Sequence, residues 1–255
     1  MAFWHKEYES IIQTLLGLNR PLGGVADFLV AQNPKYIILR HDVDRLPQQA
    51  CKLAQLEQRL GVRSTYYFRV NASGVFPAAE IFTIAQLGHE IGYHYEDLSF
   101  CGGNRDVAIL RFARNLETLR KIAPCSTVSM HGAPLSKYHN QELLNDADLQ
   151  HAALLGDAVG SLEPFSPYYL TDTGGRWLAS ASNLRDHIGQ PWPEYALPTN
   201  LLEFQRFAAN AKHPLYVSTH PERWCQSIPS YMRAQAMDMI LNSIKITLNQ
   251  ARLLK

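Results

Sequence analysis

The sequence predicts an α/β fold, a barrel or partly closed barrel of about seven parallel strands. Short runs rich in β-branched and aromatic residues alternate along the chain with longer stretches of helical periodicity. Because a helix follows most of these runs, we expect consecutive strands to be parallel, with helices covering the sheet. The length of 255 residues is typical of one α/β barrel, and we expect a single domain over residues 1–255.

The first half of the chain is the more regular. Apolar residues recur at helical spacing over 4–18, and Gly23-Gly24 ends that pattern. Glycine or proline then stands just after each later helical stretch, as expected at a helix end. We expect strands at 36–44, 64–68, 89–96 and 127–131, and helices at 47–60, 78–87 and 104–122.

The second half has shorter elements and a long loop. The pattern predicts a short helix at 141–147, an apolar piece at 151–155, strands at 168–172 and 215–220, and helices at 200–211 and 229–254. Gly174-Gly175 and Pro191-Trp192-Pro193 mark the loop, and loops of that length in compact domains often carry function.

Composition excludes several classes of protein. Lys and Arg total 24 and Asp and Glu 23, so no excess of positive charge indicates a nucleic-acid partner. No apolar run reaches the roughly 18 residues of a membrane span. The first 20 residues lack the basic start and apolar run of an export signal, and the cysteines show no C-x-x-C spacing. We therefore expect a cytoplasmic protein without disulfides.

The 36–44 strand ends in two carboxylates. Asp42 and Asp44 are two residues apart, so they should project the same way from the strand's carboxyl end. Like charges this close repel unless a cation binds between them or one is protonated. A metal site is therefore the first hypothesis. The alternative is that the two aspartates only cap a helix starting near Pro47.

Polar residues also end four other predicted strands. They are His94 and Glu96, His131, Asp172, and His220. The carboxyl ends of parallel strands form one face, which is where such folds place their active sites. Asp44 with His94 and Glu96 would supply the nitrogen and oxygen ligands that zinc or a similar divalent ion accepts, and His131 could add another nitrogen.

These residues resemble the motifs of a known family. His41-Asp42-Val43-Asp44, Gly88-His89-Glu90-Ile91-Gly92-Tyr93-His94, the aromatic-flanked Asp172 and Ser218-Thr219-His220 are similar in order and spacing to those of the polysaccharide deacetylases, over residues 36–224. The resemblance implies a distorted (β/α) barrel in which Asp42 is the catalytic base, Asp44 and His94 bind a divalent metal, and His220 is the acid.

The chain departs from that family at one metal ligand. The family places a second histidine four residues after the first, and Leu98 stands at this position. Glu96 or His131 could replace it, and we prefer His131 because it ends the next strand. The family's arginine-proline motif is also absent, and Met130-His131-Gly132-Ala133-Pro134 stands about where it would be. Later motifs add Asp172, Arg176 and Trp224 as possible site residues, which indicates a divergent branch.

The implied function is removal of an acyl group from an amide or ester on a sugar or glycan precursor. Asp42 would take a proton from water, His220 would protonate the leaving group, and a divalent metal, with zinc as the expected ion, would polarise the carbonyl. Buried aromatic residues such as Tyr67 and Trp224 could line a sugar cleft or simply pack the barrel.

Two other functions remain open on the sequence alone. A phosphatase of the haloacid dehalogenase type also begins with a strand and Asp-x-Asp, and Gly156-Asp157 could serve as its later acidic motif. A binding or regulatory barrel that has lost its metal is the other, because Leu98 replaces a ligand. Only the enzyme hypotheses require a stoichiometric divalent ion.

Overall fold

A computed structural model describes residues 3–133, 136–173, 188, 198 and 200–253. Its strands form one sheet in the order β6-β5-β4-β3-β2-β8-β7, with β1 paired to β2, and every pairing is parallel. The strands are β1 (Leu22–Gly23), β2 (Ile37–Val43), β3 (Thr65–Phe68), β4 (Glu90–Tyr95), β5 (Cys125–Met130), β6 (Gly156–Asp157), β7 (Tyr168–Thr171) and β8 (Leu215–Thr219). In the described part of the chain no pairing joins β6 to β7, so the sheet is a curled, open barrel.

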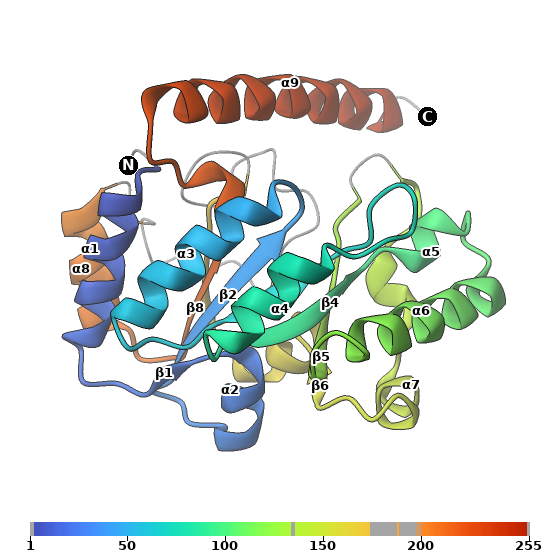
Figure 1. Cartoon of the computed structure of the whole chain (residues 1–255), viewed down its shortest axis with the longest axis horizontal. Coiled ribbons are helices and arrows are strands. Elements are labelled where there is room, and N and C mark those ends of the chain that lie inside the picture. Colours follow the sequence, from blue (N-terminus) through green and yellow to red (C-terminus); the bar gives the residue numbers. More distant parts are fainter. Residues whose placement is uncertain (1–2, 134–135, 174–187, 189–197, 199, 254–255) are drawn as a thin grey trace.

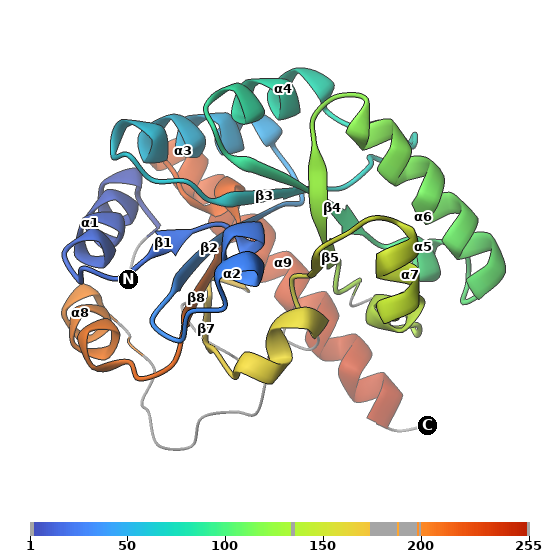
Figure 2. The ribbon, with the colours of Figure 1, turned by 90° about the horizontal axis from the view of Figure 1, so that it is seen from below.

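Most helices lie in an arc outside this sheet, whereas the helix Val25–Ala31 lies across the end at which β2 begins (Figure 2). The helices are α1 (His5–Leu16), α2 (Val25–Ala31), α3 (Pro47–Arg59), α4 (Ala78–Gln86), α5 (Asp97–Phe100), α6 (Arg105–Arg120), α7 (Asp146–His151) and α8 (Leu201–Asn210), with short 3-10 turns η1 (Asn140–Leu143), η2 (Gly160–Phe165) and η3 (Pro221–Arg223). The long α9 (Ile228–Leu253) crosses the end of the molecule toward which β2 points (Figure 1). None of the described helices combines the length and apolarity needed to cross a membrane.

The predicted fold class is confirmed, and the seven strands of the main path include six that the pattern predicted as strands. The apolar piece at 151–155 leads from the end of α7 to β6 at Gly156–Asp157, a strand that the pattern did not predict. Asn145 starts α7 by accepting a hydrogen bond from the backbone N–H of Asp148. The helix predicted at 141–147 is accordingly divided between η1 and α7.

Two elements near Gly23-Gly24 were missed, because the glycine pair reads as a break. Gly23 pairs with Ile38, and α2 begins directly after Gly24. A Cβ added at Gly24 would lie 2.6 Å from Glu90 Oε2 and 2.7 Å from Thr65 Oγ1. The glycine is therefore required by a close approach of the backbone to buried side chains. The short helix α5, which contains Leu98, was also missed.

The strand β2 is buried along its whole length and divides the core. Ile37 and Leu39 belong to one apolar cluster with α1 and α3, whereas Ile38 belongs to the other. This alternation is the two-residue period of a strand covered on both faces. Arg40 shares the Ile38 side, where its guanidinium lies near the rings of Tyr67 and Tyr216.

Below the outer face of β2, Glu57 of α3 is fully buried. It accepts hydrogen bonds from the hydroxyls of Tyr8, Tyr66 and Ser64 at 2.5, 2.7 and 2.7 Å. His41 Nε2 lies 2.9 Å from the same carboxylate. Burial would raise the pKa of Glu57, but the charge and hydrogen bond of His41 outweigh it and hold the pKa at about 2.

We expect Glu57→Gln to lower the free energy of unfolding by at least about 2 kcal/mol at pH 7, since it breaks a buried charged network. The pKa of Glu57 is depressed on folding, so its stabilisation is present above its ordinary pKa of 4.5 and is lost as the pH falls toward about 2. The difference between parent and variant, measured by denaturant unfolding, should therefore narrow at pH 3. The exposed Glu117→Gln is the control, and an equal loss at both pH values would contradict the prediction.

Candidate metal and catalytic site

The sequence-predicted polar residues do gather at one edge of the sheet. Asp42 and Asp44 lie at the end of β2, and His94 is the fifth residue of β4. His131 directly follows β5, Asp172 follows β7, and His220 follows β8. Parallel pairing brings these strand ends to the same face, so residues far apart in the chain become neighbours.

Asp44, His94 and His131 form a possible metal-binding cluster. Asp44 Oδ1 lies 3.5 Å from His94 Nε2 and 3.8 Å from His131 Nε2, and one ligand atom from each residue falls within 4.8 Å of the others. Asp44 Oδ1 is buried and has no hydrogen-bond donor in the described part of the chain. A buried carboxylate oxygen without a donor facing two imidazoles fits a cation, so these residues suit a divalent metal.

Both histidines are held with Nε2 toward Asp44. The backbone carbonyl of Ser129 lies 3.1 Å from His94 Nδ1, and because a carbonyl only accepts, the lone pair is left on Nε2. Burial lowers the pKa of His94 despite the charges of Asp42 and Asp44, which favours the neutral form that binds metals. Glu96 Oε2 lies 3.0 Å from His131 Nδ1 in the same way.

Glu96 thus lies behind His131 rather than in the cluster. Its pKa is about 2, because the hydrogen bond and charge of His131 and the charge of Arg69 outweigh the effect of burial. An ionised Glu96 orients the imidazole of His131 and makes it a better donor to a metal. This geometry favours His131 over Glu96 as the replacement for the ligand absent at Leu98, which is buried in α5.

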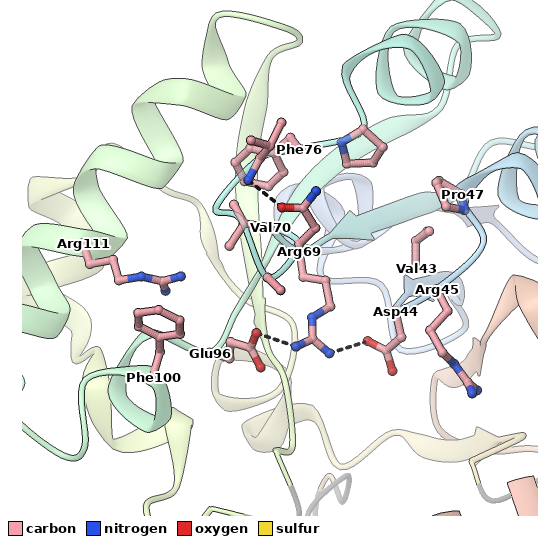
Figure 3. A pocket seen from close by; sticks show the side chains of 14 residues that line it. Val43, Asp44, Arg45, Pro47, Arg69, Val70, Phe76, Glu96, Phe100 and Arg111 are labelled. Carbon is pink, nitrogen blue, oxygen red and sulfur yellow. Dashed lines mark hydrogen bonds and ion pairs between the residues drawn. The ribbon is translucent and has the colours of Figure 1, made fainter. Parts of the chain in front are cut away.

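Arg69 was not anticipated from the sequence. It directly follows β3, and its guanidinium donates to Glu96 and lies between Glu96 and Asp44 (Figure 3). Its Nη1 is 3.2 Å from His131 Nε2 and 3.9 Å from Asp44 Oδ1. A metal bound by Asp44, His94 and His131 would use the lone pair on His131 Nε2. Arg69 faces that same lone pair, so the metal and this contact of Arg69 would exclude each other. The sequence could have indicated Arg69 only through its position, one residue after the predicted 64–68 strand and so at the same strand-end face.

Asp42 is held by a second arginine that the sequence analysis missed. Arg40 donates to both carboxylate oxygens, from Nε to Oδ1 at 2.8 Å and from Nη2 to Oδ2 at 2.6 Å. Burial would raise the pKa of Asp42, but the charges of Arg40 and His94 outweigh it and keep the pKa below its ordinary value. Asp42 Oδ2 is also 3.8 Å from His94 Nε2. The signal was an arginine inside an apolar strand, where a charge is rarely buried unpaired.

His220 and Asp172 form a buried pair on the other side of the site. Asp172 accepts from the backbone N–H of His220 at 3.0 Å and lies 2.6 Å from its Nδ1. Burial and Arg223 would lower the pKa of His220, but the charge and hydrogen bond of Asp172 raise it to about 9. The charge of His220 in turn lowers the pKa of both Asp42 and Asp44, as expected of a cationic group near these two carboxylates.

Three further sequence hypotheses have different outcomes. Trp224 is fully buried and donates from Nε1 to Asp172 at 2.9 Å, so it supports the Asp172–His220 pair and lines no surface cleft. Arg176 lies outside the described residues. The helix-cap alternative for Asp42 and Asp44 is wrong, because α3 is preceded by Leu46 and no side chain caps its first turn.

Beside Asp44 the molecule is hollowed by a cavity of about 650 Å³. Arg69, Glu96 and Asp44 line this cavity (Figure 3). Phe76, Phe100 and Arg111 line it too, at a greater distance from Asp44. The candidate metal ligand is thus accessible from a space large enough for a small substrate.

Known proteins give a limited comparison. No known protein family matches the sequence, and no curated protein matches it. Among solved structures it is similar to the peptidoglycan deacetylase PdaC from Bacillus subtilis, at 14% identity and TM-score 0.44, covering 84% of this chain and 85% of that one. A Streptococcus mutans CE4 esterase has 14% identity and TM-score 0.43, covering 96% of this chain and 89% of that one.

A CE4 family pseudoenzyme, BA3943 from Bacillus anthracis, has 13% identity and TM-score 0.40, covering 83% of this chain and 62% of that one.

The cluster predicts a defined metal dependence. Asp44→Ala and His131→Ala should each abolish stoichiometric binding of a divalent ion, because each removes one of three ligands. Glu96→Gln should still bind the metal, but about tenfold to a hundredfold more weakly, since Glu96 only orients His131. Elemental analysis of protein purified without chelator, followed by competition with a chelator, measures both effects.

His151→Ala is the control, because this histidine ends α7 and is exposed. Full metal content in Asp44→Ala would exclude the cluster as the binding site. Loss in Glu96→Gln together with retention in His131→Ala would move the third ligand to Glu96.

Proposed function

We propose that the protein is a metal-dependent hydrolase that removes an acyl group, acetyl in the simplest case, from an amide or ester on a sugar or glycan precursor. The observation that carries this is one strand-end face that holds Asp42 paired with Arg40, a three-ligand cluster around Asp44, and His220 paired with Asp172. Base, cation site and acid are the groups that acyl transfer to water requires.

Asp42 is suited to be the base. Arg40 keeps it ionised at neutral pH and fixes its direction, and each carboxylate oxygen retains a lone pair beyond the one that Arg40 occupies. In the proposed reaction Asp42 takes a proton from the attacking water as the new bond to the acyl carbon forms. A divalent cation, with zinc expected from the His, His and Asp ligands, would polarise the acyl carbonyl and make the water more acidic.

His220 is suited to be the acid. With a pKa of about 9 it carries its proton at neutral pH, and Asp172 holds the ring through Nδ1. As the carbon–nitrogen or carbon–oxygen bond breaks, Nε2 gives that proton to the leaving atom. The products are a carboxylate and a free amine or alcohol. Trp224 donates to Asp172 and so keeps the pair in this orientation.

A binding or regulatory barrel without metal is the second candidate, and Arg69 is the observation that favours it. Its guanidinium already lies beside Asp44 and His131 and supplies a positive charge there. A haloacid dehalogenase-type phosphatase is not supported. Its later acidic residue would be Asp157, but Oδ1 of Asp157 accepts from the backbone N–H groups of Val159 and Gly160 in a turn, and Oδ2 accepts from the hydroxyl of Tyr95.

Asp42→Asn should reduce hydrolysis by at least about a hundredfold, the scale expected for loss of a general base. Metal content should be unchanged. The assay is release of acetate from N-acetylated sugars, their nucleotide conjugates and short oligosaccharides, with elemental analysis in parallel. A variant as active as the parent would refute the role of Asp42. A parent that carries no stoichiometric metal and is inactive on the whole panel would favour the metal-free binding barrel.

The acid role predicts a pH profile. His220 is raised to a pKa of about 9 and must be protonated to act, so kcat should fall as the pH rises through this region. Asp172→Asn removes the charge that raises the pKa, and the alkaline limb should move to lower pH. His213→Gln, a histidine in the loop before β8, should leave the limb unchanged. Identical profiles for Asp172→Asn and the parent would exclude this assignment.

A further inference from the structure

The cavity beside Asp44 continues into a second one. The second has a volume of about 510 Å³ and shares Ala72, Phe100 and Arg111 with the first. The two therefore adjoin, and together they form a groove that begins at Asp44 and Arg69 and ends over α6 at Leu110 and Arg114. We call the part over α6 the outer groove.

The outer groove contains one positive charge that no carboxylate neutralises. Its described lining contains Arg111 and Arg114 and no carboxylate. The buried Asp97 pairs with Arg111 and offsets its charge, although Asp97 itself does not face the groove. Arg114 is exposed and forms no ion pair with any residue in the described ranges.

In the first cavity, beside Asp44, positive and negative side chains are paired. Arg69 lies between Glu96 and Asp44, so its charge is matched by two carboxylates within the first cavity. The unmatched positive charge, that of Arg114, therefore lies at the end of the groove away from the metal cluster. A ligand that reaches from the cluster to α6 would meet a cation at its far end.

Arg111 is also held in a fixed place. Its guanidinium lies 3.8 Å from the ring centroid of Phe100, which is 64% exposed at the groove surface. Figure 3 shows the guanidinium above this ring, on the side of the cavity away from Asp44. Stacking and the buried Asp97 fix the plane of the guanidinium, and a fixed guanidinium is well suited to bind the oxygens of an anion.

We propose that the outer groove binds an anionic group of the substrate, a phosphate or a carboxylate, through Arg111 and Arg114. The substrate is then an acylated sugar whose acyl group lies at the Asp44 cluster and whose negative charge lies over α6. The exposed Val107 and Leu110 border the same groove and can contact the apolar face of a sugar ring. The substrate class rests on the proposed hydrolase function, whereas the anion site itself does not.

The test measures binding before hydrolysis. Isothermal calorimetry of the metal-replete protein would use N-acetylglucosamine 1-phosphate, an N-acetylated sugar acid and neutral N-acetylglucosamine. We expect at least one charged sugar to bind more tightly than the neutral one. The variant is Arg114→Gln, chosen because Arg111 neutralises the buried Asp97 and its loss could disturb folding. Lys121→Gln, at the end of α6 and exposed, removes an equal charge outside the groove.

Arg114→Gln should raise the Kd of the charged sugar relative to the neutral one about threefold to tenfold, as expected for one exposed charge-assisted contact. Lys121→Gln should leave that ratio unchanged. Preference for the phosphate or for the carboxylate identifies which anion the groove takes. Equal binding of charged and neutral sugars, no binding of any charged sugar, or equal effects of the two variants would overturn the proposal.

The hydrolysis assay then separates the two proposals. Selective binding of a charged sugar without release of acetate would refute the hydrolase and keep the anion site. Release of acetate from neutral and charged sugars with equal KM would refute the anion site and keep the hydrolase. If both hold, Arg114→Gln should raise KM for the charged sugar and change kcat little, because Arg114 is distant from the reacting groups in the proposed pose.

Discussion

Carboxylates gathered at one edge of a buried sheet impose the main physical constraint on this structure. Asp42 and Asp44 lie at the end of β2, and Asp172 follows β7, which is separated from β2 by β8. Ionised groups cannot be buried together unless each is matched by positive charge or hydrogen bonds. Arg40 matches Asp42, and His220 with Trp224 matches Asp172. Asp44 differs, because its Oδ1 has histidines nearby but no donor within the described residues.

The difference between these carboxylates assigns them different chemistry. Asp42 and Asp172 are already satisfied, so they can act as a charged base and as a support for an acid. The charge of Asp44 can be matched either by a bound metal ion or by the guanidinium of Arg69. Glu222 adds to the electrostatics of this edge, because burial raises its pKa to about 7 while it pairs with Arg45. The site therefore combines groups with separated pKa values, which is common in catalytic sites.

Alternation along β2 allows one strand to serve both stability and chemistry. Arg40 and Asp42 lie on the inner face, among the side chains of the barrel interior. His41 between them points outward to Glu57 and Thr219, in a network that joins α3 to the sheet. Because the period of a strand is two, neighbouring residues in one motif have unrelated roles. In the His41-Asp42 motif, Asp42 is therefore a catalytic candidate, whereas His41 supports the structure.

The sequence by itself determined the alternation of strands and helices and the single face of polar strand ends, and it left Glu96 and His131 as alternatives beside Asp44 and His94. These follow from local periodicity and from the rule that parallel strands end on one side. It did not reveal β1 and α2, because the fit of Gly24 depends on Glu90 and Thr65 from other strands. Nor did it assign Arg40 and Arg69, since which carboxylate a guanidinium binds depends on three-dimensional register. Only the tertiary structure decided that Glu96 orients His131 and that Trp224 supports Asp172, because hydrogen bonds between distant residues leave no periodic trace in the chain.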